Sequence, residues 1–105
     1  MAAKKPRLYA LVKKRYPQYV AAVEALGELT RHIGPLDEKS LHLVQLGAAA
    51  AIRSEGSVHS HVRRALKAGA TPEEIRHALL GLTSVIGFPT VTAAMSWAED
   101  ILGLR

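Results

Sequence analysis

Cysteine is absent from the 105 residues of this chain. The absence excludes disulfides, thiolate metal ligands and any reaction that cycles a thiol through sulfenic acid and disulfide. It also fits a protein of the reducing cytoplasm, which is where we expect this one to act. No apolar run is long enough to cross a bilayer, and the basic N-terminal residues are not followed by the apolar segment of a signal peptide. We therefore expect no membrane partner.

Aromatic side chains are also scarce, at 5% of the residues, whereas hydrophobic residues make up 49% and many of them are alanine. The sequence shows no stretch of alternating polar and apolar residues bounded by turns, which is the pattern of a β-hairpin. Alanine-rich segments of helical period instead favour helices that pack closely on one another. The length and this pattern predict a single all-α domain.

Acidic residues are missing from the first fifteen positions, which carry Lys4, Lys5, Arg7, Lys13, Lys14 and Arg15. The other residues hold eight basic and nine acidic side chains and sum to −1, so the six positive charges at this end account for the net charge of +5. We interpret residues 1–15 as a basic N-terminal arm and residues 16–105 as the helical domain. Such an arm would suit nucleic acid. A solvated arm is the more common case, and we do not expect nucleic acid as a partner.

Several segments of the domain carry helix signals. Pro17 suits the first turn of a helix that ends at Gly34-Pro35, and Asp37 is a good N-cap for the next. That next helix is apolar on almost every side from Leu41 to Ile52, which predicts burial on every side. In so short a chain the natural cover is another copy of the same chain, so we expect a homo-oligomer.

Later helices are marked by their ends. We expect one to begin near Gly56-Ser57 and to close at Gly69. Thr71-Pro72-Glu73-Glu74 has the pattern of a capping box and opens a helix that we expect to run through Ile86 to Gly87. Pro89 starts the last one. The sequence thus predicts about five to six helices.

The most unusual stretch is Ser54–His61, with the sequence SEGSVHSH. His59 and His61 are two residues apart, so on a helix they point about 200° apart and cannot hold one ion together. Glu55 and His59 are four apart and would share a face if the helix already includes Gly56. Two donors make a weak metal pattern. We therefore expect no metal.

Acid–base chemistry is a second interpretation of this stretch. His61 lies on the apolar side of the expected helix, and the positive potential of a helix start would keep its imidazole neutral and ready to take a proton. Glu55 would orient it or act as the acid. A Ser57–His61 nucleophile–base pair is another option. A purely structural interpretation also stands, in which Glu55 and Ser57 cap the helix and His61 is a core histidine bonded to His42 or Gln45.

The segments HVRRALKAGATPEEIRHALL and GFPTVTAAMSWAEDIL resemble the carboxymuconolactone decarboxylase family, which includes the alkylhydroperoxidase D-like proteins. The resemblance covers residues 36–102. It implies an all-α, alkylhydroperoxidase D-like domain with an antiparallel helical core, assembled as a homotrimer or homohexamer. The assembly agrees with the apolar segment Leu41–Ile52.

The resemblance carries over only part of the family's chemistry. The peroxidase branch has a Cys-x-x-Cys pair four and seven residues before its histidine, and counting back from His61 gives Ser57 and Ser54. An upstream carboxylate of that branch is replaced by His42. The resemblance therefore implies no Cys-dependent peroxidase here. The decarboxylase branch, which opens a small lactone acid with loss of carbon dioxide, keeps a histidine that His61 matches.

Together these observations suggest a lyase-like enzyme without a cofactor that moves protons on a small organic acid. We expect catalytic roles for His61, Glu55 and His59, and substrate contacts from Arg53, His42 and Ser57, with the Arg53 guanidinium holding a substrate carboxylate. The alternative is a non-catalytic oligomeric binding or assembly protein on the same scaffold.

Overall fold

The computed structural model describes residues 7–103, and within that range the chain is helical, as the sequence predicts. Lys4 and Lys5 of the basic segment lie outside the described residues. The helices are α1 (Arg7–Arg15), α2 (Pro17–His32), α3 (Glu38–Ala51), α4 (Glu55–Lys67), α5 (Pro72–Leu80), α6 (Thr83–Ile86) and α7 (Phe88–Leu102). The chain divides into two compact units at Asp37 and Glu38, and each is described by itself.

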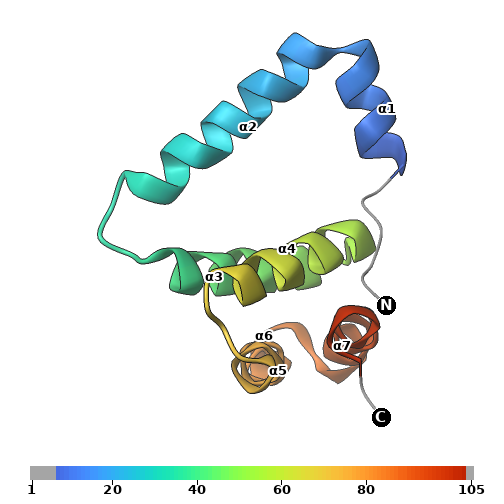
Figure 1. The fold of residues 1–105 in the computed structure, drawn as a ribbon. Helices are drawn as coiled ribbons and strands as arrows, with labels where there is room; N and C mark the ends of the chain where they lie inside the picture. Colours follow the sequence, from blue (N-terminus) through green and yellow to red (C-terminus); the bar gives the residue numbers. More distant parts are fainter. Residues whose placement is uncertain (1–6, 104–105) are drawn as a thin grey trace. The chain divides into compact units, whose positions relative to one another are not determined.

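The first unit contains α1 and α2, which form a helical hairpin (Figure 1). The Tyr9 hydroxyl donates a hydrogen bond to the Glu24 carboxylate, and Lys13 Nζ lies 3.8 Å from the same group. Glu24 therefore joins the two helices. The basic segment thus includes a regular helix from Arg7, and the boundary predicted after residue 15 falls within this unit.

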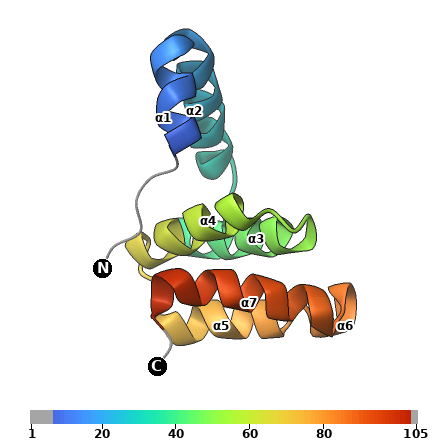
Figure 2. The ribbon, with the colours of Figure 1, turned by 90° about the vertical axis from the view of Figure 1, so that its right-hand side faces the viewer.

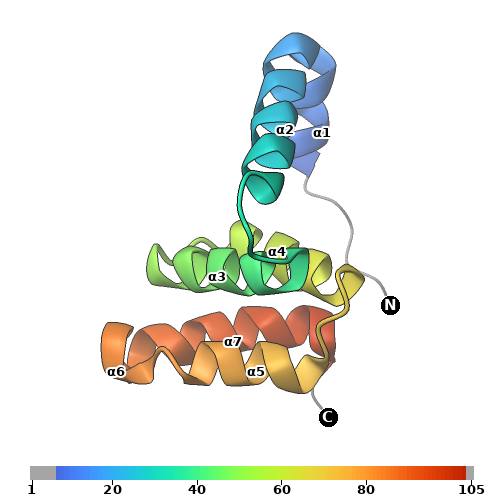
Figure 3. The same ribbon diagram turned by 90° about the vertical axis from the view of Figure 1, so that its left-hand side faces the viewer.

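The second unit has two layers of paired helices (Figures 2 and 3). Helices α3 and α4 form one layer as an antiparallel pair joined by a short turn, and α5 and α7 form the other. The most extensive helix pairing in this unit is α3 with α4, followed by α4 with α7. Helix α4 therefore contacts both α3, its partner in the same layer, and α7 of the other layer. Side chains on its different faces meet different helices.

Small side chains make this close packing feasible. Ala50, Ala65, Ala94 and Ala98 are fully buried, and a methyl side chain lets two helix backbones approach closely. The larger side chains of the core that are fully buried are Leu46, Val58, Val62, Ile75, Leu79 and Val91. Each of α3, α4 and α7 therefore contributes at least one fully buried alanine to the core.

The structure confirms some predicted helix ends and corrects others. Thr71 and Glu74 form the predicted capping box of α5. Helix α4 begins at Glu55, with Ser54 as its N-cap, so the helix starts earlier than expected and neither Glu55 nor Ser57 is the cap residue. The helix predicted to run to Ile86 ends at Leu80. After it, the backbone N–H of Leu82 donates to the carbonyl of Leu79, three residues back, and the Thr83 hydroxyl donates to the carbonyl of Leu80. These bonds replace the four-residue pattern of an α-helix.

Ion pairs tie the ends of the second unit together. Arg76 on α5 bonds both carboxylate oxygens of Glu99 on α7, at 2.7 and 3.0 Å, and also bonds Glu73. These two carboxylates raise the pKa of the Arg76 guanidinium above its ordinary value. Lys39 Nζ on α3 lies 3.1 Å from Glu74 Oε2 on α5.

Among the described residues, no helix is long and apolar enough to cross a membrane.

Glu74 makes the stability of the fold sensitive to acid. The backbone N–H of Thr71 and then Lys39 hold the pKa of the Glu74 carboxyl below its ordinary value of 4.5. A carboxyl whose pKa is lower in the folded chain stabilises the fold above the unfolded pKa, and that contribution is lost as the pH falls through the folded pKa. We expect the free energy of unfolding of Glu74→Gln, measured by urea titration from about pH 6 to about pH 3, to fall less steeply than that of the wild type.

Lys39→Met provides the matched comparison, since it removes the second cause and leaves the Thr71 bond in place. Its pH dependence should lie between those of the wild type and Glu74→Gln. Equal pH dependence in all three proteins would contradict this assignment.

Candidate functional site

The turn between α3 and α4 sets the position of every predicted site residue except His42. The Ser54 hydroxyl accepts the backbone N–H of Ser57 at 3.4 Å, and Glu55 is the first residue of α4. Gly56 is helical, although its flexibility had left this uncertain. The site residues from Glu55 to His61 are therefore spaced as in a regular helix.

His42 and His61 face each other across the α3–α4 pair. Their ring centroids are 6.0 Å apart, and the ring planes are inclined by 40°. His42 is 5% exposed and is the one buried polar residue among those described, whereas His61 is half-buried. Ser57 is half-buried and lies one turn before His61, on the same face of α4. The structure therefore brings His42 to His61, as the structural interpretation of the sequence expected.

The structure separates residues that the acid–base expectation joined. Glu55 lies near His59 and Asp100. His61 is the seventh residue of α4, beyond the first turn on which the helix dipole mainly acts. The predicted group of Glu55, His59 and His61 is thus divided between two faces of one helix.

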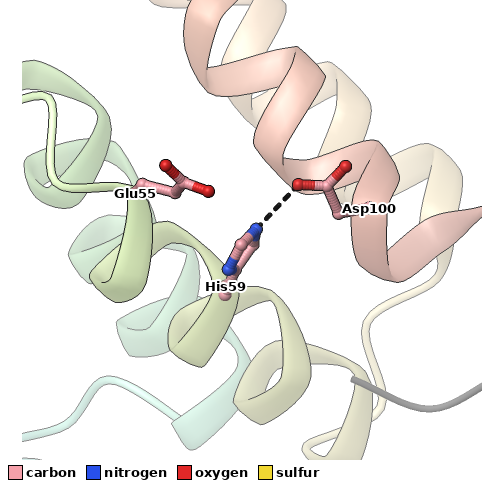
Figure 4. Close-up of side chains that lie close together, drawn as sticks. All are labelled: Glu55, His59 and Asp100. Atoms are coloured by element: carbon pink, nitrogen blue, oxygen red, sulfur yellow. Dashed lines mark hydrogen bonds and ion pairs between the residues drawn. The ribbon is translucent and has the colours of Figure 1, made fainter. Parts of the chain in front are cut away.

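A second cluster consists of Glu55, His59 and Asp100, which comes from α7 (Figure 4). One oxygen or nitrogen of each side chain lies within 4.8 Å of those of the other two, and His59 Nε2 is 2.9 Å from Asp100 Oδ2. His59 is half-buried, while Glu55 and Asp100 are exposed. We call these three residues the Glu55–His59–Asp100 cluster. Among the residues from 7 to 103, it is the one group of three such side chains with metal-binding spacing.

Sequence reasoning did not identify Asp100. The residue is 41 positions from His59, and no local motif joins them. In the structure Ala94 and Ala98 are the buried residues of α7 that flank this region, and Asp100 is exposed. Asp100 could have been identified only from the packing of α7 on α4, which places it beside His59.

Arg53, predicted to hold a substrate carboxylate, lies in the turn before α4. Its Nη1 donates to the Thr90 hydroxyl at 3.0 Å, which links the turn to the beginning of α7. Its φ of 56° places its backbone in the left-handed region, which residues other than glycine seldom adopt. Arg53 is exposed, so the rest of its guanidinium faces solvent.

Comparisons with known proteins concern the family and the fold of the chain. The model of the carboxymuconolactone decarboxylase family matches residues 17–100. The uncharacterized protein MJ1511 of Methanocaldococcus jannaschii is 29% identical over 93 residues, which span 89% of this chain and 87% of that protein. The crystal structure of apo-lpg0406, a carboxymuconolactone decarboxylase family protein from Legionella pneumophila, has a TM-score of 0.79 at 24% identity and covers 91% of this chain and 86% of its own. That likeness supports the fold.

The backbone at Arg53 is open to a direct test. Arg53→Gly should unfold no more easily than the wild type, because relief of the left-handed conformation offsets the loss of one exposed hydrogen bond. Arg53→Val should lower the free energy of unfolding by about 1 to 3 kcal/mol, since a β-branched side chain is costly in this conformation. Both variants lose the bond to Thr90, so chemical denaturation separates the two effects. Equal stability of the glycine and valine variants would contradict the assignment.

Proposed function

Since the chain belongs to the carboxymuconolactone decarboxylase family, we propose that it is an enzyme that moves a proton on a small organic acid without a thiol or a cofactor. The observation that carries the proposal is the approach of His42 and His61, at 6.0 Å between ring centroids. The proton-transferring residue is His61, because it is half-buried and therefore partly open, whereas His42 is buried. His42 is a positioning residue that acts through His61.

Histidine chemistry suits the two reactions considered for this scaffold. In a decarboxylation, the carbon that loses carbon dioxide keeps the bonding electrons and must take up a proton, which an imidazolium supplies. In a lactone opening by elimination, a neutral imidazole takes the proton from carbon while the ring C–O bond breaks to leave a carboxylate. Both steps need one group that changes its protonation state near neutral pH, and imidazole does so.

Ser57 and Arg53 provide the substrate contacts in this proposal. The Ser57 hydroxyl lies one helical turn from His61, within the region that a small substrate at His61 would occupy. The Arg53 guanidinium uses Nη1 for Thr90, and its remaining donors would bind a carboxylate as a fork. Glu55 and His59 have no part in this proton transfer, because they belong to the cluster with Asp100.

The test uses His61→Ala and a matched control, His77→Ala, which removes an exposed imidazole from α5. With 4-carboxymuconolactone and related lactone and β-keto acids as probes, we expect His61→Ala to lose about 100-fold or more in kcat/KM, as is usual for a lost acid–base group. The control should keep the wild-type value. Circular dichroism establishes that both variants are folded.

Two results would overturn the proposal. One is a wild-type rate in folded His61→Ala. The other is the absence of turnover with every acid in the panel alongside saturable binding of one of them, which would favour the non-catalytic binding protein.

We also propose that the chain acts as a homotrimer or homohexamer. Val44 and Ala48 on α3 and Ile52, directly after its end, follow one another at four-residue spacing as an apolar stripe. All three are exposed; Val44 is 60% and Ile52 73% accessible. Apolar stripes of this kind mark surfaces that another protein covers. A second copy is the occupant we propose, since α3 is the helix whose sequence is apolar nearly all round.

Assembly is tested by light scattering coupled to size exclusion. The wild type should have the mass of three or six chains, and Val44→Glu should shift it to smaller species because a carboxylate in an apolar contact loses its hydration. Val85→Glu is the matched control: the same substitution at an exposed valine on α6, away from the stripe. A wild type that is monomeric at micromolar concentration, or an assembly unaffected by Val44→Glu, would contradict the proposal.

A further inference from the structure

We propose that the Glu55–His59–Asp100 cluster binds one divalent transition-metal ion, at a site distinct from His61. Two donors come from successive turns of α4 and the third from α7, so the ion would join the two helices at their shared surface (Figure 4). The proposal goes beyond the acid–base function and does not depend on it.

The geometry is close to that of a bound ion. Ligand atoms about 2.1 Å from a metal lie about 3 to 3.5 Å from each other. His59 Nε2 and Asp100 Oδ2 are already 2.9 Å apart, and all three donor atoms fall within 4.8 Å. Glu55 is exposed on the first turn of α4, where packing does not hold its side chain in one rotamer.

The surrounding charges favour a cation. Among the described residues, neither Glu55 nor Asp100 forms an ion pair with lysine or arginine; their one close partner of opposite sign would be a protonated His59. The nearest carboxylate in sequence, Glu99, is engaged with both guanidinium nitrogens that Arg76 directs toward it. Arg76 is therefore committed elsewhere. Two carboxylates gathered around one imidazole repel each other when the imidazole is neutral, and a divalent ion removes that repulsion.

The donor set selects the kind of ion. One imidazole nitrogen with two carboxylate oxygens suits zinc or manganese, whereas calcium and magnesium prefer oxygen ligands throughout. Three protein ligands leave at least one coordination position for water or for a carboxylate ligand. The site is therefore of the open kind rather than a closed structural one.

Helix α2 provides a matched comparison within the same chain. His32 Nε2 lies 3.0 Å from Glu28 Oε2, at the same four-residue spacing as Glu55 and His59. No third donor of the described residues joins that pair. Glu28 also forms an ion pair with Arg31, at 2.8 Å between Nη2 and Oε1. The α2 pair thus has the Glu–His spacing but a guanidinium in place of a third donor, and we expect the Glu55–His59–Asp100 cluster alone to bind.

The experiment titrates zinc chloride into the full chain by calorimetry. We expect one ion per chain, and at least about tenfold weaker binding in each of His59→Asn, Asp100→Asn and Glu55→Gln, since each removes a ligand. His32→Asn and His61→Ala should bind as the wild type does. In a parallel NMR experiment, substoichiometric manganese chloride should broaden the amide signals around His59 and Asp100 and leave those around His32 sharp.

Several outcomes would overturn the site. These are the absence of zinc binding at millimolar concentration, binding that survives all three ligand substitutions, or equal losses in His32→Asn and His59→Asn. Loss of binding in His61→Ala but not in His59→Asn would place the ion at the other histidine pair and would likewise overturn it. Because zinc binding is measured without turnover, its failure leaves the acid–base function untouched.

Discussion

The close antiparallel packing of α3 on α4 is the constraint on which the rest of the second unit depends. Both helices contribute side chains with no exposed surface, among them Ala50 on α3 and Val58 on α4. A larger residue at these positions would push the helices apart, since protein interiors have no spare volume. The same packing fixes the distance between His42 and His61, because each lies on the face of its helix that meets the other.

Helix α4 carries two kinds of chemistry because it is packed on two sides. The side toward α3 holds His61 with its buried neighbour His42. The side toward α7 holds Glu55 and His59, where Asp100 completes a set of three donors. His59 and His61 are two residues apart, and that offset sends them to different partners. One short polar sequence thus places its two histidines beside different helices.

The sequence predicted the features that depend on residues close together in the chain. The all-α class follows from helical spacing, and the capping box at Thr71 and Glu74 follows from a pattern of four residues. The sequence also established that His59 and His61 point apart. It could not predict which helix each would meet, because that depends on how α3 and α7 pack on α4. For this reason Glu55 was matched with His61 instead of His59, and Asp100 was missed.

The α3–α4 pair brings His42 and His61 together, and His61 lies apart from the Glu55–His59–Asp100 cluster. Nuclear Overhauser contacts between assigned imidazole ring protons measure this arrangement, since they report proton pairs within a few ångströms. We expect a cross-peak between the rings of His42 and His61, and none between those of His59 and His61. A cross-peak between His59 and His61, with none between His42 and His61, would contradict it.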